Sequence, residues 1–102
     1  MAITFHVEDQ LHNRGASFAD DPANSFLALA RRLTSAGSQV LGIIDPYADA
    51  MFNYIQLDRL LGELDEALRG HLAPAERKMA LRVQAAAREA RGLSGYLFVE
   101  GD

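Results

Sequence analysis

The fold of this chain is decided by residues 57–68, which read Leu57-Asp58-Arg59-Leu60-Leu61-Gly62-Glu63-Leu64-Asp65-Glu66-Ala67-Leu68. The leucines recur every three or four positions, the spacing that places side chains on one face of an α-helix. We expect this helix to begin near Asp49 and to run to about Arg69, with Phe52 and Ile55 extending the apolar stripe. A helix with one apolar face must pack that face against another element.

Two further helices are expected, one on each side of this stretch. Asp21-Pro22 is a helix start, because Asp caps free backbone N–H groups and Pro loses no needed donor at the first helical position. Gly37 ends this helix in the left-handed conformation. The other helix begins near Pro74 and is rich in alanine. Its apolar face consists of Met79, Val83, Ala86, Ala87 and Ala90.

Three segments have the composition of short strands. In residues 3–7, apolar Ile3, Phe5 and Val7 alternate with polar residues, as in a half-buried strand. Residues 40–44 are a continuous apolar run between turn residues, which favours a buried central strand. Residues 96–99, Tyr-Leu-Phe-Val, have strand composition and follow a Gly-rich turn.

The polar segment of residues 8–20 is expected to be a loop, anchored to the body of the domain by Leu11 and Phe18. A loop of this length is either functional or contains a turn of helix. The elements together predict a single α+β domain over residues 1–102. Its small sheet would have about three short strands, with three helices packed mostly on one face.

Composition limits the classes of function. The chain has no cysteine, which excludes disulfides, thiolate catalysis and thiolate zinc sites. Its N-terminus has neither the basic nor the apolar region of a signal peptide, and no stretch approaches the roughly 20 apolar residues of a membrane span. We therefore expect a cytoplasmic protein without a membrane partner. The net charge of −4 argues against nucleic-acid binding and favours a cationic partner.

The residues that usually carry catalysis do not form a recognisable motif. The histidines His6, His12 and His71 are far apart and lack the paired spacing of a zinc site. No Gly-x-Ser-x-Gly motif surrounds any serine, so we expect the serines to cap helices or form turns. No Gly-rich phosphate loop is present. The sequence predicts a protein that is not an enzyme and that needs no cofactor or metal.

The segment Asp45-Pro46-Tyr47-Ala48-Asp49 is the most distinctive part of the chain, because it combines two carboxylates and a phenol. One interpretation is structural, with Asp45 closing a turn and Asp49 capping the helix that follows. A second is a binding surface, with Tyr47 as an interface anchor. A third is a small hydrolase in which the two carboxylates hold a divalent metal.

The long helix and the helix after it carry complementary charges. Acidic residues predominate on the first, whereas Arg77, Lys78, Arg82, Arg88 and Arg91 make the second basic. One interpretation is an antiparallel pair with solvated salt bridges along its rim. The other is that part of the acidic surface, including Asp58, is left to steer a basic partner. The acidic end of the chain, with Glu100 and Asp102, adds to that surface.

Residues 45–53, the leucine-rich helix and the closing residues 96–102 resemble a group of small bacterial immunity-type proteins. Members share an Asp-Pro-Tyr-x-Asp-x-x-Phe-Asn stretch and a Tyr-Leu-x-Phe-x-Gly-Asp ending, and they neutralise toxins delivered between competing bacteria. Ala48 and Glu100 depart from the pattern, since Gly and an apolar residue are expected there. The resemblance implies binding to a cognate toxin and defines no functional residues.

The leading hypothesis is therefore an immunity protein that occludes the basic active-site cleft of a toxin through an acidic surface. The partner-binding residues would be Asp45, Tyr47, Asp49, Asp58, Glu100 and Asp102. The alternative is a structural or regulatory module that forms a homodimer through the second and third helices.

Overall fold

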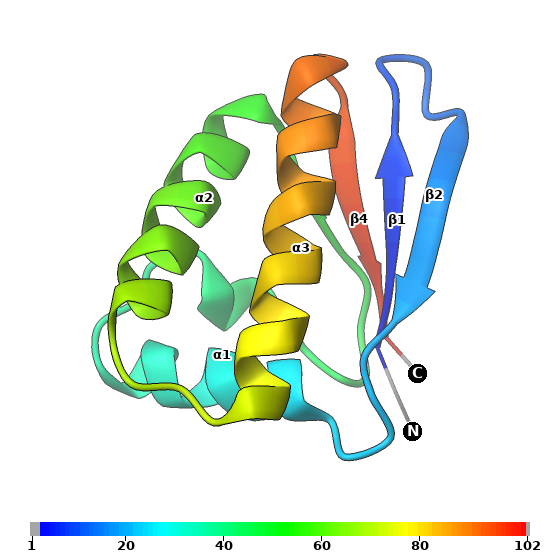
Figure 1. The fold of residues 1–102 in the computed structure, drawn as a ribbon. Coiled ribbons are helices and arrows are strands. Elements are labelled where there is room, and N and C mark those ends of the chain that lie inside the picture. The colour runs from blue at the N-terminus through cyan, green and yellow to red at the C-terminus, as the bar shows by residue number, and fades with distance from the viewer. Residues whose placement is uncertain (1–2, 102) are drawn as a thin grey trace.

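The structure, a computed structural model, describes residues 3–101. Within this range the chain forms a four-stranded antiparallel sheet, with strand order β2-β1-β4-β3, and three α-helices. In chain order the elements are β1 (Thr4–Glu8), β2 (Arg14–Ala19), α1 (Ser25–Ser35), the 3-10 turn η1 (Leu41–Ile43), β3 (Ala50–Phe52), α2 (Tyr54–Arg69), α3 (Pro74–Gly92) and β4 (Tyr96–Glu100). The helices lie on one side of the sheet, and the opposite side is an open face (Figure 1).

The α+β class and the placement of the helices confirm the sequence prediction, although the sheet has one strand more than expected. The first and last strands, β1 and β4, pair antiparallel along their full length at the centre of the sheet. Both ends of the described chain consequently lie at the same end of the sheet (Figure 1). We call this the terminal end, and the opposite end, where β1 turns into β2, the hairpin end.

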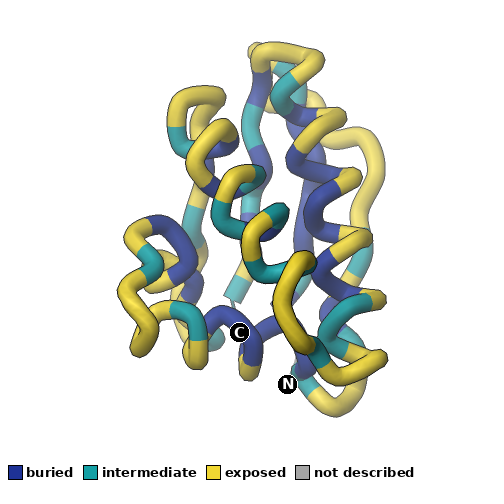
Figure 2. Tube along the Cα trace, turned by 60° about the vertical axis from the view of Figure 1, so that its left-hand side comes forward, coloured by how far each residue is buried: buried dark blue, intermediate teal, exposed yellow. Residues whose placement is uncertain are grey.

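The core lies between the sheet and the helices. Figure 2 shows the buried positions gathered on the inward sides of the elements and the exposed ones on the outer turns. The sheet contributes Phe5, Val7, Leu97 and Val99, all at most 1% exposed. The predicted helix stripes are confirmed by burial, with Leu57, Leu60 and Leu64 on α2 and the expected five residues on α3. Ile55 was wrongly included in the stripe and is 65% exposed.

The prediction of a loop over residues 8–20 was wrong, because Arg14–Ala19 form β2 and pair with β1. Phe18 does contact the core, with its ring stacked on Phe5 at a centroid distance of 5.0 Å. Leu11, the other proposed anchor, lies at the hairpin tip and is 81% exposed. The strand was missed because Gly15, Ala16, Ser17 and Ala19 are small. Ala16 and Phe18 point inward while Gly and Ser intervene, so the pattern carries little hydrophobic contrast.

The predicted central strand at residues 40–44 was also wrong. This segment is a 3-10 turn in which Val40, Leu41 and Ile44 are buried and the two residues between are exposed. The strand lies further along, at Ala50–Phe52, inside the segment predicted to be helical. Helix α2 therefore begins at Tyr54 instead of Asp49. A continuous apolar run does not distinguish a strand from a turn that buries its ends.

The side chain of Asn53 caps α2 by accepting a hydrogen bond from the backbone N–H of Gln56 at 3.0 Å. The Gln56 side chain accepts one in return from the N–H of Asn53 at 3.0 Å. This reciprocal capping box satisfies two backbone donors at the helix start. The interpretation that Asp49 caps this helix was therefore wrong, because the cap is Asn53.

Helix α1 starts three residues later than the Asp21-Pro22 signal suggested, at Ser25. The buried carboxylate of Asp20 accepts hydrogen bonds from the backbone N–H groups of Phe26 and Leu27, both at 3.0 Å. The end of α1 confirms the prediction for Gly37, which has a φ of 108°. The N–H of Gly37 donates to the carbonyl of Thr34 at 3.1 Å, closing the helix.

No helix in the described range of residues 3–101 is long and apolar enough to cross a membrane.

The capping of α1 by Asp20 can be tested by substitution. We expect Asp20→Ala to lower the free energy of unfolding by about 2 kcal/mol, because the backbone N–H groups of Asp21, Phe26 and Leu27 lose a charged acceptor. Asp20→Asn should lose less, since one oxygen remains. Urea denaturation with an unchanged slope would measure both effects. An unchanged midpoint for Asp20→Ala would show that α1 does not depend on this cap.

Candidate functional site

The candidate site is the acidic turn, which we define as residues 45–49, together with the end of β4. Backbone bridging between Asp45 and Ala48 closes the turn. The Asp45 side chain also accepts a hydrogen bond from the backbone N–H of Tyr47 at 2.8 Å. The structural interpretation of Asp45 as a turn residue is therefore correct, and it does not remove the carboxylate from the surface, since Asp45 is exposed.

The acidic turn is held against the last described residue of the chain. The carboxylate of Asp49 accepts a hydrogen bond from the backbone N–H of Gly101 at 2.9 Å. A Cβ atom at position 101 would overlap the backbone of Ala48, so only glycine allows this close approach. The turn and the end of β4, which are 52 residues apart at this bond, therefore form one rigid unit at the terminal end.

This unit presents one large aromatic side chain and several acids to solvent. Tyr47 is 70% exposed. Asp45, Asp49 and Glu100 are also exposed. Of the six residues predicted to bind a partner, the structure thus brings these four to the terminal end. Asp102 lies outside the described residues.

Asp58 lies elsewhere, near the start of α2 and the hairpin end. Its carboxylate accepts a hydrogen bond from the side chain of Arg91 on α3 at 2.7 Å. That bond raises the pKa of the Arg91 guanidinium. Arg91 also lies over the ring of Tyr54, 5.8 Å from its centroid. Asp58 is therefore engaged in the pairing of α2 with α3, as the structural interpretation of the helix charges expects.

The open face of the sheet carries a hydrogen-bonded chain that sequence reasoning missed. Nδ1 of His6 lies 2.7 Å from Oγ of Ser17, and Nε2 lies 2.9 Å from a carboxylate oxygen of Glu100. A carboxylate only accepts, so Nε2–H donates to Glu100, and in the neutral ring Nδ1 accepts from the Ser17 hydroxyl. The three residues come from β1, β2 and β4, separated by up to 94 positions.

A second polar cluster covers the hairpin end of the same face. The side chain of Glu8, only 5% exposed, contacts Nδ1 of His12 at 2.9 Å and Nε of Arg14 at 3.1 Å. His12 stacks on Tyr96 with ring centroids 4.4 Å apart. Arg14 lies over the ring of Phe98, 5.0 Å from its centroid. The open face is thus covered by paired polar and aromatic side chains, and Glu8 is compensated by two partners.

The connectivity of Ser17, His6 and Glu100 is the one by which hydrolases activate a serine. Catalysis of that kind also needs a cavity for the substrate and donors aimed at a developing oxyanion. Ser17 lies on an exposed strand and lines none of three cavities in the described residues, two beside α1 and one beside α3. We interpret these hydrogen bonds as structural contacts that connect the three strands β2, β1 and β4. No local pattern indicates this hydrogen bonding, and the prediction that Ser17 caps a helix or forms a turn was wrong.

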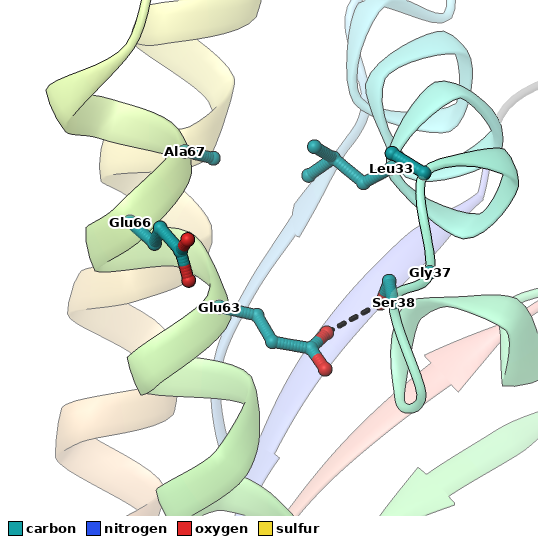
Figure 3. Close-up of a pocket in the computed structure, with 7 residues that line it drawn as sticks. Leu33, Gly37, Ser38, Glu63, Glu66 and Ala67 are labelled. Carbon is teal, nitrogen blue, oxygen red and sulfur yellow. Dashed lines mark hydrogen bonds between the residues drawn. The ribbon is translucent and has the colours of Figure 1, made fainter.

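The largest of these cavities, of about 370 Å³, lies between the end of α1 and α2. Leu33 and Ala67 form apolar walls, and Figure 3 shows the carboxylate of Glu63 reaching across to Ser38. Glu63 accepts hydrogen bonds from the Ser38 hydroxyl and, at 3.1 Å, from the backbone N–H of Gln39. Its charge therefore ties the segment after α1 to α2. A second cavity, of about 250 Å³, lies between α1 and η1.

In the described residues, no group of three or more His, Asp or Glu side chains is placed to hold a metal ion. The carboxylates of Asp45 and Asp49 each accept a backbone hydrogen bond, as described above. The apolar faces of α2 and α3 are buried inside the chain. A homodimer through these helices would consequently have to use their outer surfaces, where Ile55 is 65% exposed and Leu81 49%.

Comparison with known proteins gives no match, whether to a family model, to a curated protein or to a solved structure.

The contact between the acidic turn and Gly101 can be tested by adding a methyl group. We expect Gly101→Ala to lower the free energy of unfolding by about 1 kcal/mol or more, because the new Cβ overlaps the backbone of Ala48. Gly62→Ala is the control. Nothing lies within 4 Å of a Cβ at position 62 of α2, so this change should raise stability by about 0.5–1 kcal/mol. If the two variants change the melting temperature by the same amount, the close contact between Gly101 and Ala48 is contradicted.

Proposed function

We propose that this chain is an immunity-type protein, which binds a cognate bacterial toxin in the cytoplasm and blocks the toxin's active site. The observation that carries the proposal is the acidic turn, which is held rigid and displays Tyr47 at 70% exposure beside two carboxylates. The resemblance of residues 45–53 and 96–102 to such proteins is the second support.

The geometry of the acidic turn suits recognition of another protein. Tyrosine is enriched among the residues that dominate binding energy, because its ring supplies a large contact area and few rotatable bonds must be fixed. The turn is closed by the bridge between Asp45 and Ala48 and tied to β4 by the bond from Gly101 to Asp49. A preformed loop loses less conformational entropy on binding than a mobile one.

The electrostatics support a basic partner. No Lys or Arg occurs between Val40 and Asp58 or after Arg91, so the sequence around the acidic turn and β4 carries no cation of its own. Asp58, by contrast, is paired with Arg91. The acidic surface that remains for a partner is therefore narrower than the net charge of −4 suggests.

An acidic surface of this kind would act on a toxin whose active-site cleft is basic, as clefts that bind nucleic acids or nucleotides are. Opposite charges would speed the encounter of the two proteins, and the Tyr47 ring would supply contact area within the cleft. Inhibition would result from occupying the cleft, so no catalytic group is required.

The first experiment is to express the protein encoded by the adjacent gene in a bacterial host, alone and together with this chain. The proposal expects that the neighbour arrests growth, that this chain restores growth, and that the two proteins copurify. If no adjacent gene product is toxic and none forms a complex with this chain, the proposal is wrong. Sedimentation equilibrium of the chain alone tests the alternative, which requires a tight homodimer and no binding to the neighbour.

The contribution of Tyr47 is tested with a matched pair of tyrosine variants. Tyr47→Ala should weaken binding to the toxin by about 30-fold, which corresponds to the roughly 2 kcal/mol typical of a central interface residue. Tyr54→Ala is the control, because the Tyr54 side chain is also exposed, at 50%, but lies at the start of α2. Isothermal titration calorimetry gives both constants. Equal losses in the two variants would place the interface elsewhere.

The role of charge is tested with Asp49→Asn, which removes the charge and keeps an oxygen to accept from the Gly101 N–H. We expect slower association and a weaker dependence of the association rate on salt, measured by stopped-flow fluorescence. Asp65→Asn on α2, where Asp65 pairs with Arg69, should leave the association rate unchanged.

A further inference from the structure

The outer edge of β2 lies on the other side of the sheet from β3 and the acidic turn. Within the described chain, β2 pairs only with β1, so one side of its backbone is without a partner strand. Five of its six residues are exposed, the exception being Phe18. The other edge strand, β3, is only three residues long.

The register of β2 shows which backbone groups face outward. The N–H of Asp20 donates to the carbonyl of Ile3 at 2.9 Å. Hydrogen-bonded and non-hydrogen-bonded pairs alternate along an antiparallel ladder. Ser17 and Ala19, three and one positions before Asp20, therefore belong to non-hydrogen-bonded pairs. Their N–H and C=O groups point away from β1, towards the free edge.

Edges of this kind are usually protected by charged side chains, proline or a covering element. Arg14 and a β-bulge blunt the first part of β2. The remaining residues, Ala16 to Ala19, include neither proline nor a charged residue, and Ser17 and Ala19 have small side chains. Figure 1 shows β2 at the side of the sheet, beyond α3. The edge is therefore open to another backbone.

A groove of about 220 Å³ runs beside this edge on the helix side of the sheet. Its apolar surface consists of Val7, Ala16, Phe18, Ala85 and Ala86. A strand added to β2 would direct every second side chain to the helix side, as β2 itself does with Ala16 and Phe18. The groove lies where those side chains would need space.

The groove carries opposite charges at two positions along α3. Arg82 lies over the ring of Phe18, 4.4 Å from its centroid. Glu89 lines the same groove two helical turns further along α3. An incoming segment would complement these charges with a carboxylate near Arg82, a cation near Glu89 and apolar side chains between them.

We infer that the outer edge of β2 binds an extended peptide segment of another protein as a fifth strand, with its apolar side chains in the groove beside α3. Backbone hydrogen bonds at Ser17 and Ala19 would supply affinity, and the groove would supply selectivity. This inference goes beyond the proposed function, because the edge is separate from the acidic turn and needs no toxin for its test.

The test selects random nonapeptides displayed on phage against the whole protein and measures binding of the enriched peptides by fluorescence anisotropy. The decisive variant is Ala19→Pro, because proline removes an N–H that faces the free edge and leaves pairing with β1 intact. We expect at least a tenfold loss of affinity. Ala19→Ser retains the N–H and should bind as the unchanged protein does.

A second variant and a direct readout guard against misfolding of Ala19→Pro. Ala85→Lys fills the groove from the exposed side of α3 and should also weaken binding tenfold, whereas Ala28→Lys on the exposed side of α1 should have no effect. Hydrogen exchange followed by NMR should show that the bound peptide protects the amides of Ser17 and Ala19 at least tenfold.

Three outcomes would overturn the inference. One is that no peptide is enriched. Another is that enriched peptides bind Ala19→Pro and Ala85→Lys unchanged and leave the amides of Ser17 and Ala19 unprotected. The third is that sedimentation shows a dimer of this chain that Ala19→Pro dissociates, because a second copy would then occupy the edge. None of these outcomes depends on whether the acidic turn binds a toxin.

Discussion

The antiparallel pairing of β1 with β4 is the interaction on which the rest of the structure depends. It joins the first and last strands of the described chain, so that Phe5 lies opposite Val99 and Val7 opposite Leu97. These four side chains form the floor on which the helices pack, and each is at most 1% exposed. The pairing also places β2 and β3 at the two edges of the sheet. Closing such a long loop is costly in entropy, and the shared core offsets that cost.

The same pairing organises the polar side of the sheet. His6 on β1 can reach both Ser17 on β2 and Glu100 on β4 because the three strands are neighbours. At the hairpin end, Glu8 forms an ion pair with Arg14 and a hydrogen bond with His12. The polar side chains described on the open face therefore find their hydrogen-bond and ion-pair partners on that same face. The groups that remain available to a partner lie at the borders of the sheet, in the acidic turn on one side and the backbone of β2 on the other.

The two borders differ in chemistry, and they would select different features of a partner. The acidic turn offers charge and one aromatic ring, which favour a basic concave surface. The β2 edge offers backbone hydrogen bonds and a small apolar groove, which favour an extended segment. An inhibitor that used both would hold its target at two well-separated points. Asp58, although acidic, contributes to neither border, because it pairs with Arg91 on the exposed surface between α2 and α3.

The sequence by itself determined the three helices, apart from the residues at which α1 and α2 begin, the strands β1 and β4, the α+β class and the turn at Asp45. Helical periodicity and strand alternation are local, so they can be recognised without knowing what packs where. Only the tertiary structure decided that residues 14–19 are a strand and residues 40–44 a turn, that Asp49 contacts Gly101, and that His6 joins Ser17 to Glu100. These features depend on contacts between residues far apart in the chain, and small or ambiguous side chains leave no local pattern that specifies such contacts.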